Sequence, residues 1–337
     1  MKKSKGIKKH SNGRIQFVGG KFVNDRNHTL DITIGFCVRN SGRTVRDSFQ
    51  SILNQDYPKK NTKIVIVDGN STDRTMEIAK KMVREIEVES EFYSEGGKGL
   101  GTARQMVLDH SNGKYVIFVD GDVIVSPVFV TNQVKYMEDN SEIGVATGRY
   151  VLWRRGVSSL SGLLQSLSKF MGSVTYRRTK EYHGLPPNDA SIYRIDASNY
   201  VGGFDTAIRG AGEDEDIILR IINAGWQVSV NNEANYSAFS RHSLKSLWGE
   251  HFWFGQGKHF IRHKHKLRTP MPIPPVFFII GLRECQAAYR LTGQKESFLL
   301  PTYYVFGTVA WWFGFVHAHC SGYGHSRPAY DHFVSPE

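Results

Sequence analysis

The stretch YVIFVDGDVIV, Tyr115–Val125, carries two carboxylates, one glycine apart, in the middle of an apolar run. The run predicts a buried strand, although Asp-Gly is also a common turn dipeptide between two strands. A hairpin would require a second strand of the same kind directly afterwards, but Pro127 and then helical periodicity follow. Asp120 and Asp122 are therefore expected at a strand end, where Gly121 would let the chain kink and present one or both carboxylates to a hard divalent cation.

On the N-terminal side of this stretch, short β-rich runs alternate with helical periodicity from Asp31 onward. The runs ITIGFCV, KIVIVD and VESEFY predict strands, and VRDSFQSILNQ, STDRTMEIAKKMVREI and GLGTARQMVLDH predict helices. This order predicts right-handed βαβ units and therefore an α/β fold with a mostly parallel sheet flanked by helices. Asn40, Asp68 and Asp120 each follow a strand, at the edge where open α/β sheets bind ligands.

The pattern after this stretch is less regular. EIGVATGRYVLW and ASIYRID predict strands, EDEDIILRIINAGW predicts a helix ending at Gly225, and QVSVNN predicts a short strand. RHSLKSLWGEHFWFGQGKHF predicts an aromatic and basic amphipathic helix. The four prolines between Pro270 and Pro275 predict a linker before a final apolar region.

Charge and cysteine content limit the class of protein. The chain has 337 residues and a formal net charge of +11, with basic residues concentrated in the first 26 residues and in Lys258–Arg268. Such surfaces bind nucleic acid, anionic lipid or phosphorylated substrates. Cys37, Cys285 and Cys320 are too few and too widely spaced for a disulfide framework or a zinc site, and are expected to be reduced.

The apolar tail suggests contact with a membrane. Phe298–Val316 has no charged residue and about the length of a membrane span, but its proline, glycines and paired tyrosines and tryptophans are typical of the membrane interface. We expect helices that lie in or dip into one leaflet rather than a true span, with a soluble core helix as the other alternative. The predicted organisation is a basic extension over 1–30, a catalytic domain over 31–265 and a membrane-associated region over 266–337.

Two further segments carry groups suited to a nucleotide. In IVDGNSTDRT, Asp68 would accept a hydrogen bond from a base or a ribose hydroxyl, unless the segment is an ordinary strand-turn-helix connection. In EGGKGLGTARQ, the glycines would let backbone approach a ligand, and Lys98 and Arg104 would neutralise a diphosphate. A surface loop is the alternative for this second segment.

The acids of GEDEDIILR, residues 212–220, suit the start of a helix. If they face a cleft, Asp214 is a candidate general base. His242 is a candidate third metal ligand beside the two aspartates of the opening stretch, although a lone histidine is more often a surface or cap residue.

Taken in order, these segments resemble the motifs of the inverting family-two glycosyltransferases with the GT-A fold. RNSGRTVRDSFQSILNQDYPKKNTKIVIVDGNSTDRT is similar to the family's first strand-helix-strand segment, and GGKGLGTARQ to its basic glycine-rich element. Asp120-Gly121-Asp122 matches its DXD motif, GGFDTAIRGAGEDEDIILRIINAGW its acidic helix start, and His242 its downstream histidine. The resemblance covers about Asp31–Lys258, and the apolar tail is similar to the membrane-associated C-terminus of many members.

The chain departs from the family pattern at three positions. Cys37 stands where a proline is usual, Ser41 where an acid follows Asn40, and Gly69 where a second aspartate follows Asp68. These departures leave the contacts to the nucleotide base less closely matched than the DXD and acidic helix motifs.

The resemblance implies a GT-A nucleotide-binding sheet, a UDP- or GDP-linked sugar donor, Mg²⁺ or Mn²⁺, and inversion at the anomeric carbon. Asp214 would deprotonate an acceptor hydroxyl, or would only orient a polyprenyl phosphate, whose oxygen is already ionised. The implied roles are donor binding by Asn40, Asp68, Lys98, Arg104 and Asp120; metal binding by Asp120, Asp122 and His242; and an acceptor side at Gly203, Glu213 and Asp216.

The expected partners are a polyprenyl-linked or glycan acceptor and an anionic membrane surface, with the enzyme at the cytoplasmic face of the cell membrane and no nucleic acid bound. One alternative is a sugar-1-phosphate nucleotidylyltransferase, which would need a glycine-rich loop that RNSGRTV does not supply. The other is a non-catalytic nucleic-acid-binding protein that uses the basic surface, which the acids of the predicted cleft disfavour.

Overall fold

The computed structural model describes residues 31–84, 88–153, 157–179, 189–268 and 270–322, with side chains up to residue 175 in the third range. It also gives the backbone of an antiparallel pair, β1 (Phe17–Val18) and β2 (Lys21–Phe22). The chain divides into two compact units, Met1–Leu30 and Asp31–Glu337. Apart from that pair, the predicted basic extension over 1–30 lies outside the described residues, as do residues 323–337 of the predicted membrane region.

A single eight-stranded sheet runs through the described part of the larger unit, in the order β5-β4-β3-β6-β9-β8-β10-β7. β5, β4, β3 and β6 are parallel, β9 is antiparallel to both of its neighbours, and β10 is parallel to β8 and antiparallel to β7. The mostly parallel sheet is confirmed, and the hairpin alternative for the opening stretch is excluded because β7 pairs with β10 and not with β6. The strands are β3 (Ile32–Val38), β4 (Thr62–Asp68), β5 (Glu89–Ser94), β6 (Tyr115–Val119), β7 (Val123–Val125), β8 (Ile143–Tyr150), β9 (Ala190–Arg194) and β10 (Gln227–Ala238).

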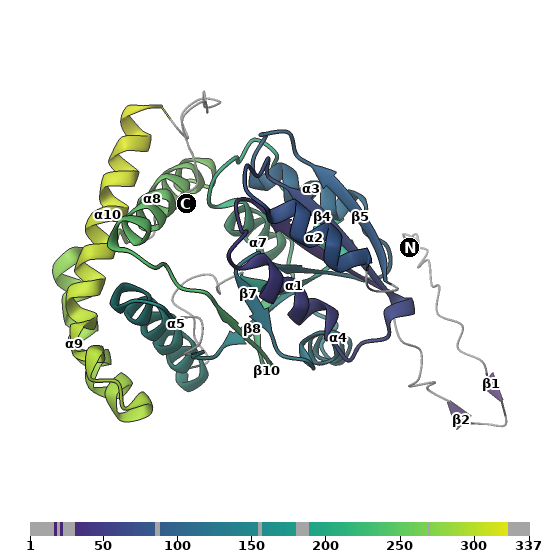
Figure 1. Cartoon of the computed structure of the whole chain (residues 1–337), viewed down its shortest axis with the longest axis horizontal. Coiled ribbons are helices and arrows are strands. Elements are labelled where there is room, and N and C mark those ends of the chain that lie inside the picture. The colour runs from purple at the N-terminus through teal and green to yellow at the C-terminus, as the bar shows by residue number, and fades with distance from the viewer. Residues whose placement is uncertain are drawn as a thin grey trace, which may run out of the picture. The chain divides into compact units, whose positions relative to one another are not determined.

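Helices cover both faces of this sheet (Figure 1). One face carries α1 (Val45–Leu53), α2 (Thr75–Arg84) and α4 (Phe129–Asp139), and the other carries α3 (Leu100–Asp109), α6 (Ile195–Tyr200) and α7 (Glu213–Asn223). Because side chains alternate along a strand, each central strand must be apolar on both faces. This requirement explains the continuous apolar runs in the sequence.

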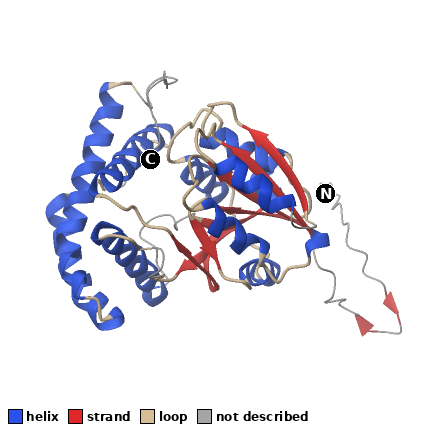
Figure 2. Cartoon of the chain, in the orientation of Figure 1, coloured by secondary structure: helices blue, strands red, loops and turns tan. Residues whose placement is uncertain are grey.

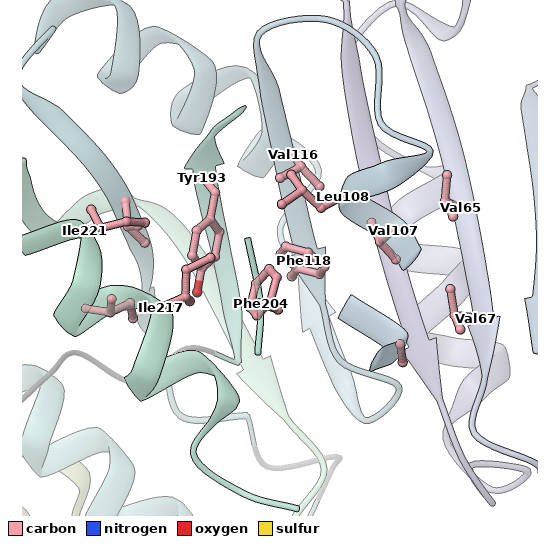
Figure 3. Close-up of a cluster of buried hydrophobic side chains, with 13 residues drawn as sticks. Val65, Val67, Val107, Leu108, Val116, Phe118, Tyr193, Phe204, Ile217 and Ile221 are labelled. Carbon is pink, nitrogen blue, oxygen red and sulfur yellow. The ribbon is translucent and has the colours of Figure 1, made fainter. Parts of the chain in front are cut away.

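The core between the sheet, α3 and α7 contains the side chains that the strands direct to one face (Figure 3). Val65 and Val67 of β4 point to this core, while Ile64 and Ile66, also fully buried, point to the opposite face. Phe118 of β6 packs edge-on against rings from two later segments of the chain. Each such buried side chain contributes about 1.5–3 kcal/mol to folding, so the sheet is a rigid base for the residues at its strand ends.

A second group of helices lies at one end of the unit, beyond β8 and β10 (Figures 1 and 2). It consists of α5 (Leu160–Thr179), α8 (Leu244–Lys264), α9 (Pro274–Thr292), the short 3₁₀ helix η3 (Lys295–Leu299) and α10 (Leu300–Cys320). These helices share their own apolar core, which includes Leu167, Leu247, Ala288 and Leu300. Helices before and after residue 265 therefore fold as one body.

Several elements differ from the sequence prediction. α5 and α6 were not predicted, and α6 begins at Ile195, inside the predicted strand ASIYRID. β10 is 12 residues long rather than a short strand. The linker predicted from the four prolines is shorter than expected, because Pro274 and Pro275 belong to the first turn of α9. Their fixed φ and missing N–H suit that position. Over the described residues, one helix, Lys295–Cys320, is long and apolar enough to cross a membrane, and 39% of its most apolar window is buried.

Candidate active site

A cavity of about 1250 Å³ lies at the carboxyl ends of β3, β4 and β6. We call its side at these strand ends and the start of α7 the sheet wall. The side formed by α8, α9 and α10 is the helical wall. The predicted site residues that line the cavity are Asn40, Arg104, Asp120, Asp122, Glu213, Asp214 and His242.

The Asp-Gly-Asp segment forms a tight turn fixed by its neighbours. The N–H of Val123 donates to the carbonyl of Asp120 at 3.0 Å, and the Gly121 carbonyl accepts from the hydroxyls of Thr44 at 2.7 Å and Ser48 at 3.1 Å. Both hydroxyls belong to the start of α1. The turn is thus held against α1 by hydrogen bonds.

Gly121 is required for a different reason from the one predicted. It is not among the glycines with positive φ, so its backbone conformation is open to other residues. A Cβ at this position would lie 2.9 Å from the Ser41 hydroxyl oxygen and 3.0 Å from a Val38 methyl carbon. Gly121 therefore allows close approach of two loops rather than a kink.

Arg104 links two acids of the sheet wall. Its Nη2 lies 3.1 Å from Oδ1 of Asp120, and its Nε lies 3.2 Å from Oε1 of Glu213. The Arg104 and Glu213 side chains are each only 3% exposed. Arg104 is therefore engaged with the protein's own carboxylates and holds Asp120 and Glu213 together, while its role beside Lys98 at a diphosphate stays a prediction.

Three acids of the sheet wall, Asp120, Asp122 and Glu213, resist ionisation. Burial, with Asp189, Asp122 and Asp214 nearby, raises the pKa of Asp120 to about 7 despite Arg104. Burial and the adjacent Asp214 raise the pKa of Glu213 to about 8, and burial also raises the pKa of Asp122. Arg104 alone does not neutralise these clustered carboxylates, so a bound cation would favour their ionised forms.

The chemistry of Asp120 and Asp122 fits a hard divalent cation, because both offer carboxylate oxygens at one turn beside open cavity. His242 does not join them. Its Nδ1 lies 3.2 Å from Nη1 of Arg43, and its side chain is exposed. Within the described residues, no group of three ligand atoms within 4.8 Å of one another includes these aspartates. A divalent cation would therefore be held by the two carboxylates, with oxygens of a substrate as its further ligands.

Among the charged cavity residues that the sequence did not reveal, four lie around Asp122. Nζ of Lys169 lies 2.8 Å from Oδ2 of Asp189, and Nη2 of Arg241 lies 3.1 Å from Glu250 and 3.9 Å from Asp122. Asp189 directly precedes the predicted strand ASIYRID, which was a usable signal. Lys169 and Glu250 sit inside helices, where nothing in the local pattern distinguishes them from surface charges.

The glycine-rich segment contributes Gly97 and Gly99 to the cavity lining, but its later part packs against another loop. A Cβ on Gly99 or Gly101 would lie 2.4 Å from backbone atoms of Arg209 or Asp205. The N–H groups of Leu100 and Gly101 donate to the carbonyls of Arg209 and Ile208, each at 3.1 Å. The first amides of α3 are thus used by the 205–209 loop. Lys98 is exposed and is not a lining residue, although Gly97 and Gly99 on either side of it are.

Asn40 follows β3 and Asp68 ends β4, and both bond to the segment of Ser71 and Thr72. Asn40 has φ +47°, and its Oδ1 accepts from the N–H of Thr72 at 2.9 Å. The Asp68 carboxylate accepts from the N–H of Ser71 at 3.1 Å. Asn40 lines the cavity, whereas Asp68 does not, although Val67 and Gly69 do.

Two of the acceptor-side candidates are structural. Asp216 is fully buried and bonded to Arg220, Lys264 and His265, at 2.6, 2.6 and 2.7 Å. Gly203, with φ +72°, packs against Gln105, whose Oε1 would lie 2.2 Å from an added Cβ. Neither residue lines the cavity, because sequence proximity to the acids does not determine side-chain direction.

Asp214 and Glu213 divide the start of α7 between them. Both line the cavity, but Glu213 is buried and paired with Arg104, while Asp214 is partly exposed and accepts from the N–H of Glu215 at 2.7 Å. Gly212, with φ +104°, ends the preceding turn and allows this start of the helix to face the cavity. Asp214 therefore has the accessible position that a general base needs.

The helical wall is aromatic. His251, on α8, lies 3.4 Å through its Nε2 from the Tyr303 hydroxyl, and burial lowers the pKa of His251. Broad, flat surfaces of this kind bind sugar rings and apolar chains. The other aromatic lining residues on this side are Trp253, Phe254, Phe277, Tyr304 and Trp311.

Known proteins match both the sequence and the fold. The family model of Glycosyl transferase family 2 matches residues 33–199, which run from β3 into α6 and include the Asp-Gly-Asp turn but not Asp214 or His242. The Bacillus subtilis (strain 168) protein EpsE, which carries a glycosyltransferase name, is 29% identical over 216 residues, covering 61% of this chain and 74% of EpsE.

Two further matches differ in what they cover. The poly(ribitol-phosphate) beta-N-acetylglucosaminyltransferase TarS of Staphylococcus aureus (strain Mu50 / ATCC 700699) is 26% identical over 157 residues, 46% of this chain but only 26% of TarS. The mannosyltransferase PcManGT of Pyrobaculum calidifontis, solved with GDP-Man and Mn²⁺, has a TM-score of 0.57 at 15% identity over 84% of this chain and 87% of its own. At this sequence identity, the match to PcManGT shows a shared fold and nothing further.

Proposed function

The chain belongs to the family-two glycosyltransferases, and on this basis we propose that it transfers a sugar from a nucleoside-diphosphate sugar to a glycan or lipid-linked acceptor, with inversion. The observation that carries the proposal is the sheet wall, where Asp120, Asp122 and Asp214 line one cavity at the strand ends. PcManGT, a fold relative, was solved with a GDP-sugar and Mn²⁺, which supports this class of donor and a divalent cation, Mg²⁺ or Mn²⁺.

In this proposal the donor lies across the ends of β3 and β4. Asn40 faces its nucleoside, while Asp68 and Lys98 flank lining residues and contact it from the rim. Asp120 and Asp122 hold the cation, and Arg104 keeps Asp120 in position. The cation would supply neutralisation of the charge that develops on the departing diphosphate.

Asp214 accepts the proton of the acceptor hydroxyl while that oxygen attacks the anomeric carbon from the face opposite the diphosphate. With an ionised phosphate acceptor no base is needed, and Asp214 orients the acceptor instead. The acceptor rests on the helical wall, whose aromatic side chains suit a sugar or a polyprenyl chain.

The same helices support a location at the cytoplasmic face of a membrane, with the protein peripheral to it. α9 buries a narrow stripe of Gly281, Cys285 and Ala288, while Phe278, Ile279 and Leu282 are 43%, 57% and 51% exposed. An apolar exposed face beside a basic segment suits an anionic lipid surface. Co-sedimentation with anionic but not with zwitterionic vesicles tests this location.

The test of activity is to incubate the full chain with UDP- and GDP-sugars, Mn²⁺ or Mg²⁺, and polyprenyl phosphate or glycan acceptors. We expect released nucleoside diphosphate and a glycosylated acceptor, and about a 10³-fold lower turnover in Asp122→Asn. Asp139→Asn, at an exposed position at the end of α4, is the matched control. Formation of inorganic pyrophosphate instead of the sugar product, or full turnover in Asp122→Asn, would contradict the proposal.

A further inference from the structure

Three histidines form a cluster away from the sheet wall, between the ends of α8 and α10. His259 and His263 are one turn apart near the end of α8, and His319 is near the end of α10. One nitrogen from each of the three rings lies within 4.8 Å of the others. His259 is fully buried and the other two rings are exposed, so the cluster is open on one side.

The spacing of two of these nitrogens matches a metal site. Nε2 of His259 lies 3.2 Å from Nδ1 of His319. Two nitrogens bound at about 2.0–2.1 Å to one tetrahedral Zn²⁺ lie roughly 3.3 Å apart. A direct imidazole-imidazole hydrogen bond gives a similar distance, so the third ring and its orientation are needed to decide between them.

The third ring is held in an orientation suited to ligation. Nδ1 of His263 lies 2.8 Å from the carbonyl oxygen of His259, and the His259 and His263 rings are 4.1 Å apart. A carbonyl that accepts from Nδ1–H leaves the lone pair on Nε2, which is the arrangement that commonly orients histidine ligands. Phe315 packs edge-on against His259 at 4.9 Å and fixes that ring as well.

We propose that His259, His263 and His319 bind a divalent transition metal, of which Zn²⁺ is the expected one, that fastens the end of α10 to α8. Imidazole nitrogens suit zinc, whereas the carboxylates of the sheet wall suit Mg²⁺ or Mn²⁺. The two sites therefore select different metals. Three protein ligands leave a fourth position open to water or to another donor.

The site has a structural consequence for the cavity. α8 carries the lining residues Trp253 and Lys258, and α10 carries Tyr303 and Trp311. A metal that joins the ends of these two helices would restrain the helical wall without touching the acids of the sheet wall. Zinc is thus expected to act on stability and on the shape of the acceptor side.

The test uses the full chain, stripped of metal with a chelator and titrated with Zn²⁺ in excess Mg²⁺. We expect about one Zn²⁺ bound per chain and a higher melting temperature on binding. Single His263→Gln and His319→Gln variants should bind Zn²⁺ at least tenfold more weakly. Both replaced side chains are exposed, so the metal-free variants should melt like the metal-free parent chain.

His317→Gln is the matched control, because His317 is on α10 but contacts Gln256, through Nδ1 at 3.2 Å, and is outside the cluster. This variant should bind Zn²⁺ like the parent chain. Co²⁺ gives a second readout, since a tetrahedral site produces intense visible absorption that Zn²⁺ displaces. No zinc binding in excess Mg²⁺, or equal binding by the two cluster variants and the parent chain, would overturn the proposal.

Discussion

The sheet wall and the helical wall of the cavity are stabilised by different interactions. Loops of the sheet wall are joined by hydrogen bonds, as where the Gly121 carbonyl accepts from two hydroxyls of α1. In the helical wall, α8 and α10 are packed so closely that a Cβ on Gly255 or Gly314 would lie 1.9 Å from the carbonyl oxygen of Trp311 or Phe252.

The two walls are expected to have different roles, the sheet wall in the reaction and the helical wall in the shape of the acceptor side. The acids of the sheet wall can hold a cation and move a proton, and burial and neighbouring carboxylates raise the pKa values of Asp120 and Glu213. The helical wall offers mainly aromatic surface. Substitutions in the first wall should therefore change turnover, and substitutions in the second should change stability and acceptor binding.

The largest expected effect is on turnover, in Asp214→Asn. Loss of a general base typically lowers kcat by about 10²–10⁴-fold, and we expect about 10³-fold with a hydroxyl acceptor. The free energy of unfolding should hardly change, because the Asp214 side chain is partly exposed and its hydrogen bond is to the neighbouring Glu215 N–H. A kcat within tenfold of the parent chain would remove Asp214 from the reaction with such acceptors.

Asp216→Asn, two residues further along α7, should lower stability and leave turnover nearly unchanged. This carboxylate is buried among Arg220, Lys264 and His265, and removing one partner of a buried ion pair costs about 3 kcal/mol of unfolding free energy. Urea unfolding measures the loss, and kcat at a temperature where the variant is folded should stay within a few fold. A large loss of kcat in the folded variant would mean that Asp216 takes part in the reaction and not only in stability.

The stability that Asp216 provides should also depend on pH. Burial alone would raise the pKa of Asp216, but the hydrogen bonds from Lys264, Arg220 and His265 hold it below its ordinary value. A carboxyl with a lowered folded-state pKa stabilises fully above its unfolded value, near 4, and loses this effect as pH falls through the folded value. The difference between the parent chain and Asp216→Asn should therefore shrink below about pH 4.

The sequence predicted the sheet wall much better than the helical wall. The strands β3, β4 and β6 are continuous apolar runs, so their ends, and hence Asn40 and Asp120, could be placed by pattern alone. The positions of Asp122 and Asp214 followed from motif order. These features are local in sequence, because a strand end is defined by the few residues around it.

The direction of side chains and the packing of distant helices could not be read in the same way. Arg104 binds Asp120 and Glu213, which are 16 and 109 positions away in the chain, and no local pattern encodes that choice. α5 has glycine and serine among its apolar residues, so it lacks the clear periodicity of α1. The aromatic wall likewise exists only after α8 and α10 meet.

Packing in the helical wall can be tested with a pair of glycines. Gly314→Ala would force a methyl group against the Phe252 carbonyl, and such overpacking costs about 2 kcal/mol. Gly172→Ala on α5, where nothing lies within 4 Å, should instead stabilise by about 0.5–1 kcal/mol. Thermal unfolding of both variants measures the contrast, and equal shifts would show that α8 and α10 are not closely packed.

The smallest effect tests the hydrogen-bonded loops of the sheet wall, at Asp73. Its Oδ2 accepts from the Gly42 N–H at 2.8 Å, and its Oδ1 accepts from the Thr75 N–H at 2.9 Å, so it ties the start of α2 to the loop after β3. Oδ1 also accepts from the Thr75 hydroxyl, so Asp73→Ala removes all three bonds, and losing such a cap at the start of a helix costs about 1 kcal/mol. Because the side chain is exposed, water replaces part of what is lost.

The charge of Asp73 can be separated from its geometry. Burial acts to raise its pKa, but the hydrogen bonds from Thr75 and Gly42 hold the pKa of Asp73 below its ordinary value. Its contribution is therefore present above about pH 4 and lost as pH falls further. Asp73→Asn keeps one acceptor oxygen and no charge, so its stability should lie between those of the parent chain and Asp73→Ala, with no dependence on pH at this position. If all three proteins unfold alike at neutral pH, the loops of the sheet wall are held by packing, and the contrast between the two walls is lost.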